Sequence, residues 1–168
     1  METLKEQQEL PLKLAYAEAT RYMNNAEETL KKSVKEDKYY RDDKYVRVAC
    51  GTAYLGVLKA LDGCFEFKGI PRPPKKKRAS IEYYKSNLAQ LDGKMLTQLN
   101  DVYQVLHLNG CYEGVRNVAI IRSGFDSAYG IIARIKPAHE LTPDEVKTLR
   151  AQKIPAWLRP LSSLFALL

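Results

Sequence analysis

The chain has 168 residues, of which 45% are hydrophobic and 28% are charged, and its formal net charge is +7 at pH 7. This size and balance are typical of one globular domain with a hydrophobic core. No uncharged apolar run approaches the roughly 18 residues of a membrane span, and the charged first ten residues lack the apolar core of a signal peptide. We therefore expect a soluble, unexported, cytoplasmic protein without a membrane partner.

Two long stretches in the first half of the chain have apolar residues at every third or fourth position, a period that predicts amphipathic α-helices. The first covers residues 12–34 and should fray near Glu36. The second, over about 42–67, carries neighbouring stripes of small and large side chains, which predict a central helix that another backbone can approach closely. Its stripes contain Ala49, Ala53, Gly56 and Ala60, and Tyr54, Leu58, Leu61 and Phe65.

The connection that follows, residues 68–78, contains six Lys or Arg and no Asp or Glu, so it supplies nearly all of the excess positive charge. Its densest part consists of Lys75, Lys76, Lys77 and Arg78. These cations could bind nucleic-acid phosphates, since clustered cations gain affinity by releasing counterions. Alternatively, the three prolines stiffen a solvated connection whose charges keep the protein soluble.

The second half of the chain predicts two more long helices. Ser80 is a suitable N-cap for a third helix whose apolar positions run from Ile81 to Leu106. A glycine-bracketed turn separates it from a fourth helix over 118–135, which Pro137 ends. Consecutive long helices with short connections run antiparallel. The sequence therefore predicts an all-α fold, an up-and-down antiparallel four-helix bundle.

A short fifth helix is predicted over about residues 143–152. Thr142 is its N-cap, Pro143 occupies its first position, and Glu145 completes a capping box with Thr142.

The chain beyond this helix is apolar but is interrupted by two prolines, so it cannot form one regular helix. It must be covered, either by a groove of its own bundle or by a second subunit. We therefore divide the chain into a helical bundle over 1–137 and a short helix with an apolar tail over 138–168.

The three cysteines, Cys50, Cys64 and Cys111, are widely spaced and lie among apolar residues. This pattern predicts reduced core thiols rather than a disulfide framework or a metal site. The chain has no Gly-rich phosphate loop, no H-E-x-x-H and no G-x-S-x-G motif. We expect neither a metal nor a cofactor.

The two histidines are the residues best suited to acid–base chemistry. His107 lies at the end of the third predicted helix, where it could bond the last carbonyls and stabilise that end. Alternatively, it serves catalysis or ligand binding with Tyr103, Tyr112 and Arg116, which are close in sequence. His139 follows the fourth helix and is expected to be an exposed loop residue.

Three stretches carry a resemblance to a known family: AEATRYMNNAEETLKKS, YYRDDKYVRVACGTAYLGVLKALD and the turn LHLNGCYEG. Over about residues 12–137 the chain resembles bacterial HEPN-like helical bundles, particularly small ones of unassigned function. The resemblance implies a homodimer. Many members of the wider group are ribonucleases, or partners of nucleotidyltransferases in toxin–antitoxin and defence systems.

Catalytic members of that group carry an arginine, a polar residue and then a histidine, four to six positions in all, near the start of the last bundle helix. Arg134 and His139 match this spacing, but they lie at the end of the fourth predicted helix. Ile135 replaces the polar residue, and Pro137 interrupts the helix between them. A pair formed by His107 and Arg116 would reverse the order of the motif.

We therefore expect a non-enzymatic HEPN-like protein that forms a homodimer and acts through protein or nucleic-acid contacts. The alternative is a metal-independent ribonuclease in which His107 or His139 transfers protons and an arginine stabilises the phosphate charge. A third interpretation is a small-ligand site near Tyr103, His107 and Tyr112.

Overall fold

The computed structural model describes residues 4–74 and 78–151. Its helices are α1 (Leu4–Lys31), α2 (Asp43–Phe67), α3 (Ile81–Leu91), α4 (Gly93–Val102), the π-helix η1 (Tyr103–Glu113), α5 (Val118–Arg134) and α6 (Pro143–Ala151). The strands are β1 (Lys35–Glu36) and β2 (Tyr39–Tyr40). The all-α expectation is confirmed, because the described residues are mostly helical and the strands form only a two-residue hairpin.

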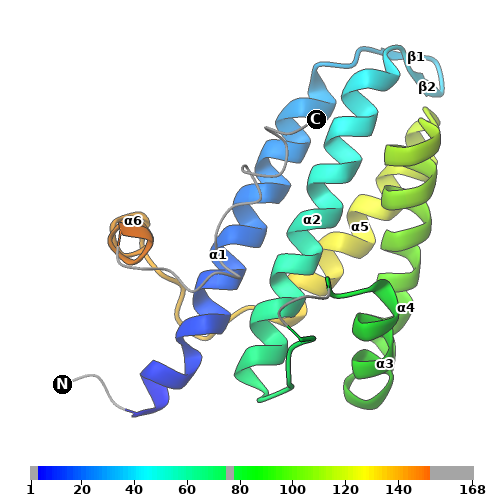
Figure 1. Ribbon diagram of the computed structural model, residues 1–168. Coiled ribbons are helices and arrows are strands. Elements are labelled where there is room, and N and C mark those ends of the chain that lie inside the picture. Colours follow the sequence, from blue (N-terminus) through cyan, green and yellow to red (C-terminus); the bar gives the residue numbers. More distant parts are fainter. Residues whose placement is uncertain (1–3, 75–77, 152–168) are drawn as a thin grey trace.

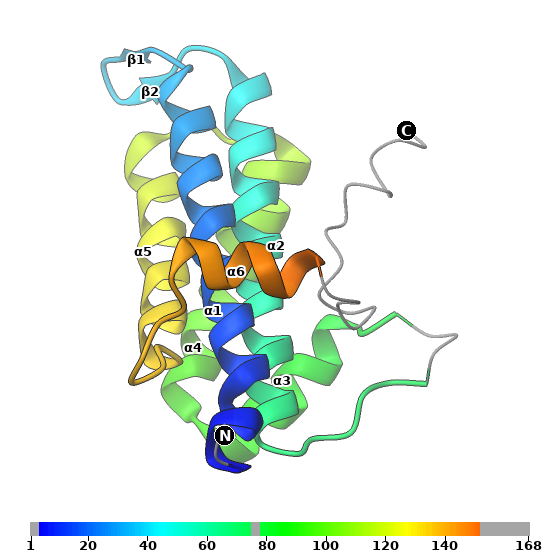
Figure 2. The same cartoon turned by 90° about the vertical axis from the view of Figure 1, so that its left-hand side faces the viewer.

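The long helices lie side by side and alternate in direction along the chain (Figure 1). α1 and α2 form an antiparallel pair joined by the hairpin, and α4 with η1 runs back alongside α2 before α5 returns. α6 crosses the outer side of α1 (Figure 2). We call the end with the hairpin the apical end and the opposite end the basal end.

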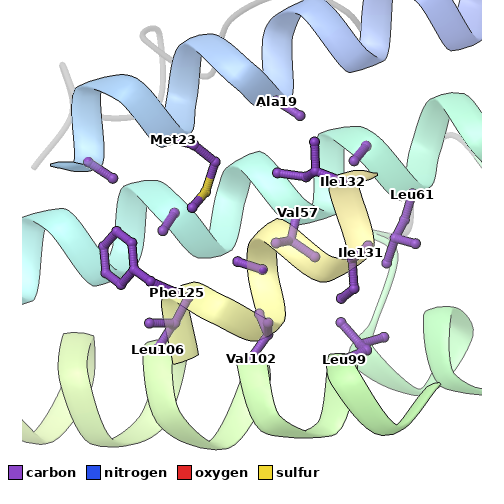
Figure 3. Close-up of a cluster of buried hydrophobic side chains, with 14 of the residues drawn as sticks. Ala19, Met23, Val57, Leu61, Leu99, Val102, Leu106, Phe125, Ile131 and Ile132 are labelled. Carbon is purple, nitrogen blue, oxygen red and sulfur yellow. The ribbon is translucent and has the colours of Figure 1, made fainter. Parts of the chain in front are cut away.

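The core lies between α1, α2, α4 with η1, and α5 (Figure 3). Helix α2 is central, because it contacts α1, η1 and α5. Its small residues allow this: a Cβ at Gly56 would lie 2.8 Å from the Cβ of Tyr22 on α1. Helix α2 is also the one described helix long and apolar enough to cross a membrane, but 61% of its apolar window is buried, as in the core helix of a soluble protein.

The prediction of one continuous third helix is wrong, because the chain breaks at Asp92. This residue is extended, with φ −159° and ψ 99°, and its Oδ1 accepts hydrogen bonds from the backbone N–H groups of Lys94 and Met95, each at 3.0 Å. A side chain that satisfies these N–H groups starts a new helix. The predicted element is therefore divided into α3, α4 and η1.

The turn predicted between Gly110 and Gly114 is also displaced, because η1 continues to Glu113. Gly114 then ends it with φ 73°, a left-handed conformation that glycine adopts at little cost. Cys50 on α2 fits against the π-helix because Gly110 has no side chain: a Cβ there would lie 2.8 Å from the Cβ of Cys50.

The capping box of the short helix is confirmed. The backbone N–H of Thr142 donates to Glu145 Oε2 at 2.7 Å, and the Glu145 N–H donates to Thr142 Oγ1 at 3.3 Å. Cys50 and Cys64 are buried, Cys111 is half-buried, and all three are free thiols. The apolar tail from residue 152 onward lies outside the described residues. That it is covered by its own bundle or by a second subunit therefore stays a prediction.

Candidate functional site

A cluster of three rings forms where α2 meets the π-helix. His107 stacks on Tyr54 of α2 with ring centroids 4.5 Å apart and an interplanar angle of 25°. Tyr103, one turn earlier on η1, lies 5.3 Å from His107 and 6.2 Å from Tyr54. The Nζ of Lys85 on α3 lies 5.0 Å from the Tyr103 ring centroid, within range of a cation–π interaction. All four side chains are partly exposed.

Burial favours the uncharged forms of His107 and Tyr54. It lowers the pKa of His107, because the imidazolium form loses hydration. Burial, with the nearby Tyr103 and Glu82, raises the pKa of Tyr54 to about 12. The neutral imidazole is able to accept a proton, yet its described neighbours in the cluster are tyrosine rings. The cluster is therefore suited to stacking more than to acid–base chemistry.

The π-helix itself is an unusual support for these rings. π-Helical turns are rare, and they occur frequently at functional sites because the extra residue per turn redirects side chains. Tyr103 is the first residue of η1, and His107 lies on its next turn.

A second candidate region is the apical end, where Arg47 of α2 binds the end of the π-helix through hydrogen bonds. Its guanidinium donates to the carbonyls of Tyr112 at 2.5 Å, Glu113 at 3.1 Å and Cys111 at 3.3 Å. The carboxylate of Asp43 holds the Arg47 Nε at 2.9 Å. These last helical carbonyls would otherwise need water as a partner.

The hairpin is attached to the same end by backbone hydrogen bonds. The N–H of Tyr40 donates to the carbonyl of Arg116 at 2.8 Å, and the N–H of Val118 donates to the carbonyl of Lys38 at 2.9 Å. Arg116 Nη1 donates in turn to the carbonyl of Arg41 at 3.0 Å. The start of α5, the hairpin and the start of α2 therefore form one connected framework.

This framework carries large apolar side chains in contact with solvent. The exposed fractions are 79% for Tyr112, 64% for Val34, 51% for Tyr39 and 41% for Ile120. We call these four residues the apical surface. Exposed large apolar side chains on a fixed backbone are a feature of interaction sites.

A family model for a domain of unknown function, DUF5618, matches residues 14–137. The chain belongs to this family. The DUF5618 match begins within α1 and ends after α5, so it includes both the ring cluster and the apical surface.

A solved structure supports the fold of this DUF5618 protein. A protein of unknown function from Dyadobacter fermentans is 44% identical to the chain and superposes with a TM-score of 0.65. The likeness covers 72% of this chain and 93% of that one. No curated protein matches the chain.

The four candidate catalytic residues of the DUF5618 chain lie in separate surroundings. His107 is in the ring cluster, and Arg116 is bonded to a backbone carbonyl at the apical end. Arg134 ends α5 and binds Asp92 Oδ2 through Nε and Nη2, at 2.9 and 2.6 Å. His139 is exposed between α5 and α6. Because α5 has 17 residues and rises about 1.5 Å per residue, Arg116 and Arg134 lie at opposite ends of the molecule.

The predicted ligand residues are only partly brought together. Tyr103 and His107 are in contact, whereas Tyr112 belongs to the apical surface, and Tyr54 completes the ring cluster in its place. Tyr54 was missed because the sequence shows it only as a large apolar position of α2. Val34 was missed because its spacing predicts a buried position at the end of the first helix, whereas α1 ends at Lys31 and Val34 is exposed. Tyr39 was missed because nothing local indicates the hairpin.

The basic connection is described only in part. Arg72 pairs with Glu66 at the surface, and Arg78 is exposed. Lys75, Lys76 and Lys77 lie outside the described residues. Among the residues that the structure describes, no group of three His, Cys, Asp or Glu side chains is arranged to hold a metal ion.

Proposed function

We propose that this DUF5618 protein is a non-enzymatic, HEPN-like helical-bundle protein that acts in the cytoplasm by binding a protein partner through its apical surface. The partner is a second copy of the chain, so the active form is a homodimer. The observation that carries this proposal is the apical surface itself, in which Tyr112, Val34 and Tyr39 are more than half exposed on a hydrogen-bonded framework.

The backbone that carries the apical surface is held in place by hydrogen bonds. An exposed tyrosine on a fixed backbone loses little conformational entropy on binding, because only two side-chain torsions remain to be ordered. The carbonyl of Tyr112 is held by Arg47, and the strand of Tyr39 is held between β1 and the start of α5. Burial of such side chains in an interface contributes roughly 25 cal/mol for each Å² of apolar area removed from water.

The balance of charges favours a protein over a nucleic acid. Residues 31–44, which lead into and out of the hairpin, contain six Lys or Arg and four Asp or Glu. The net charge of this segment is therefore small. A polyanion is bound by a large excess of cations, whereas mixed charges around apolar side chains are typical of a protein interface.

The HEPN-like assignment rests on the resemblance over residues 12–137, on the alternating long helices and on a DUF5618 match over almost the same range. By the same resemblance, the dimer would work in a toxin–antitoxin-like or defence system, with a nucleotidyltransferase as a second kind of partner.

The ribonuclease alternative has weaker support. The group's catalytic motif belongs near the start of the last bundle helix, where this chain has Arg116 followed by the polar Asn117, the N-cap of α5. The residue six positions after Arg116 is Arg122 instead of histidine. Its guanidinium is bound to Glu27 at 2.9 and 3.0 Å. An arginine paired in this way does not transfer protons near pH 7.

The proposal is tested by the mass of the protein in solution. Size-exclusion chromatography with light scattering should give a dimer for the wild type and a monomer for the double variant Tyr112→Ser with Val34→Ser. The matched control is Phe67→Ser with Leu91→Ser, which removes apolar side chains of 41% and 42% exposure from the basal end. The control should remain a dimer, and circular dichroism should show all three proteins folded.

A monomeric wild type, or a dimer that survives the apical changes, would contradict the proposal. Binding of single-stranded RNA that weakens with salt and is lost when residues 75–78 are neutralised would support a nucleic-acid role instead. Degradation of RNA in the presence of EDTA, lost in His107→Ala or His139→Ala, would support the ribonuclease.

A further inference from the structure

We propose that the basal end of the molecule binds a small amphipathic carboxylic acid of about the size of hexanoate. A cavity of about 230 Å³ opens there, between the first part of α1, the end of α2, the junction of α3 with α4, and the end of α5. We call it the basal cavity. It lies far from the apical surface and does not depend on the proposed protein interaction.

The inside of the basal cavity is apolar. Leu88 and Met95 are almost fully buried and form its floor with the thiol of Cys64. Phe67 and Leu91 line it as well, yet about two-fifths of each side chain remains exposed. A hydrocarbon chain in the cavity would cover these two side chains, which is the usual driving force of ligand binding in apolar pockets.

The rim of the cavity carries more positive than negative charge. It contains Lys68, Arg134 and Lys136 but only one carboxylate, Asp92. Arg134 is bound to Asp92, and Lys136 is paired with Glu140 at 2.8 Å. Across residues 4–74 and 78–151, no carboxylate forms an ion pair with Lys68. A ligand carboxylate would give Lys68 that partner.

The other group that attracts anions at this end is already occupied. Asp92 Oδ1 accepts the N–H groups of Lys94 and Met95 at the start of α4, so these donors are not free for a ligand. The pKa of Asp92 is lowered by these bonds and by Arg134, so it stays ionised at neutral pH. The headgroup is therefore recognised by the Lys68 side chain.

The volume limits the length of the chain. Drug-sized ligands occupy pockets of roughly 300–1,000 Å³, and this cavity is smaller. One water takes about 30 Å³ of liquid, so the cavity has room for about seven or eight waters, or a similar number of carbon and oxygen atoms. Hexanoate is of that size, and for so few atoms we expect a Kd of roughly 0.1–1 mM.

NMR signals of the methionine methyl groups measure this binding directly. The chain contains Met1, Met23 and Met95. Met95 lines the cavity, whereas Met23 is 1% exposed in the core between the helices. In protein labelled with ¹³C on the methionine methyl groups, hexanoate should shift the Met95 signal in a saturable way and leave the Met23 signal in place. The variant Met95→Leu assigns the signal.

Matched probes and variants test the chemical class. Acetate, which has the charge without the chain, should cause no saturable shift, and hexylammonium should bind more weakly than hexanoate. Because an exposed ion pair is worth only a small free energy, Lys68→Met should weaken hexanoate binding by about fivefold. Lys94→Met, an exposed lysine outside the cavity, should leave it unchanged.

Two results would overturn the proposal. The first is a Met95 signal that does not saturate with millimolar hexanoate. The second is equal affinity for hexanoate, hexanol and hexylammonium with no effect of Lys68→Met, which would mean that the cavity binds hydrocarbon without recognising a carboxylate.

Discussion

The guanidinium of Arg122 on α5 makes two hydrogen bonds to the carboxylate of Glu27 on α1, at 2.9 and 3.0 Å. The hydroxyl of Tyr129 donates to the same carboxylate at 3.2 Å. The backbones of α1 and α5 approach each other closely at few positions, and this half-buried group joins the first and last long helices of the bundle.

Removal of this carboxylate should destabilise the protein. We expect Glu27→Gln to lower the free energy of unfolding by about 1 kcal/mol, because Arg122 loses a charged partner at a partly exposed site. Urea denaturation measures the loss. The neighbouring Glu28 is exposed and has no ion pair among the described residues, so Glu28→Gln should change stability by less than about 0.5 kcal/mol. Equal losses in the two variants would show that the Glu27 pair contributes nothing.

Gly114 should tolerate a methyl group worse than Gly69 does. Both have positive φ, 73° and 70°, so alanine at either position costs about 1–2 kcal/mol in backbone strain. A Cβ at Gly114 would also collide with the guanidinium of Arg47, whereas a Cβ at Gly69 meets nothing within 4 Å.

The melting temperature of Gly114→Ala should therefore fall further than that of Gly69→Ala. In proteins that also carry Arg47→Met, the two alanine variants should lower the melting temperature equally, because the guanidinium that the Cβ would displace is absent. If the two alanine variants melt together in the wild-type background, Arg47 does not restrain the end of η1.

Acid should remove the stabilisation that the ionised Asp92 carboxylate gives to the fold. Its pKa lies below the ordinary value of 3.8, because it accepts the Met95 N–H and binds Arg134. A lowered pKa means that the carboxylate stabilises the fold above about pH 4, and that this stabilisation is lost as the pH falls through the folded value.

Asp92→Asn keeps an N-cap but loses the charge, whereas Asp92→Ala also loses the cap, at a cost of about 1 kcal/mol. At pH 7 we expect the wild type to have the highest melting temperature, Asp92→Asn a lower one and Asp92→Ala the lowest. In thermal melts, the difference in melting temperature between the wild type and Asp92→Asn should narrow as the pH falls from 7 to 3. If the difference in melting temperature between these two proteins stays constant from pH 7 to pH 3, the charge of Asp92 does not stabilise the fold.

His107 should make the fold less stable in mild acid. Burial places its folded pKa below the ordinary value of 6.5, so the unfolded chain binds protons first as the pH falls. The stabilisation that the neutral ring provides is present above about pH 6.5 and is lost as the pH falls through the folded pKa. His107→Phe keeps a ring for stacking and does not titrate.

Urea denaturation at pH 7.5 and pH 5 measures this difference. The wild type should lose more stability between the two pH values than His107→Phe, and the exposed His139→Gln should behave as the wild type. An identical loss in wild type and His107→Phe would place the pH sensitivity elsewhere.

The helical period located most of the elements because it depends on burial along one face, which the sequence records directly. It failed at Asp92 for the same reason. The apolar positions Leu88, Leu91, Met95 and Leu99 keep their spacing across the break, so the period does not register a side chain that stops one helix and starts the next. The Asp-Gly pair at 92–93 was the signal that could have located it.

The site could be predicted only where its parts are close in sequence. Tyr103 and His107 share one helix, so their proximity was foreseeable. Tyr54 reaches them through the packing of α2 on η1, and Tyr39 reaches Asn117 through a bridge between distant segments. Such contacts depend on tertiary structure, and a two-residue strand is too short to leave a pattern of its own.

The π-helix has a consequence for insertions and deletions. A turn of η1 holds more residues than an α-turn, so loss of one residue between Tyr103 and Glu113 would change how the residues after it are turned about the helix axis. Gly110 would then leave its place against Cys50, and a bulkier neighbour would face α2. A single-residue deletion here should therefore be tolerated far less than one at residues 71–74, before α3.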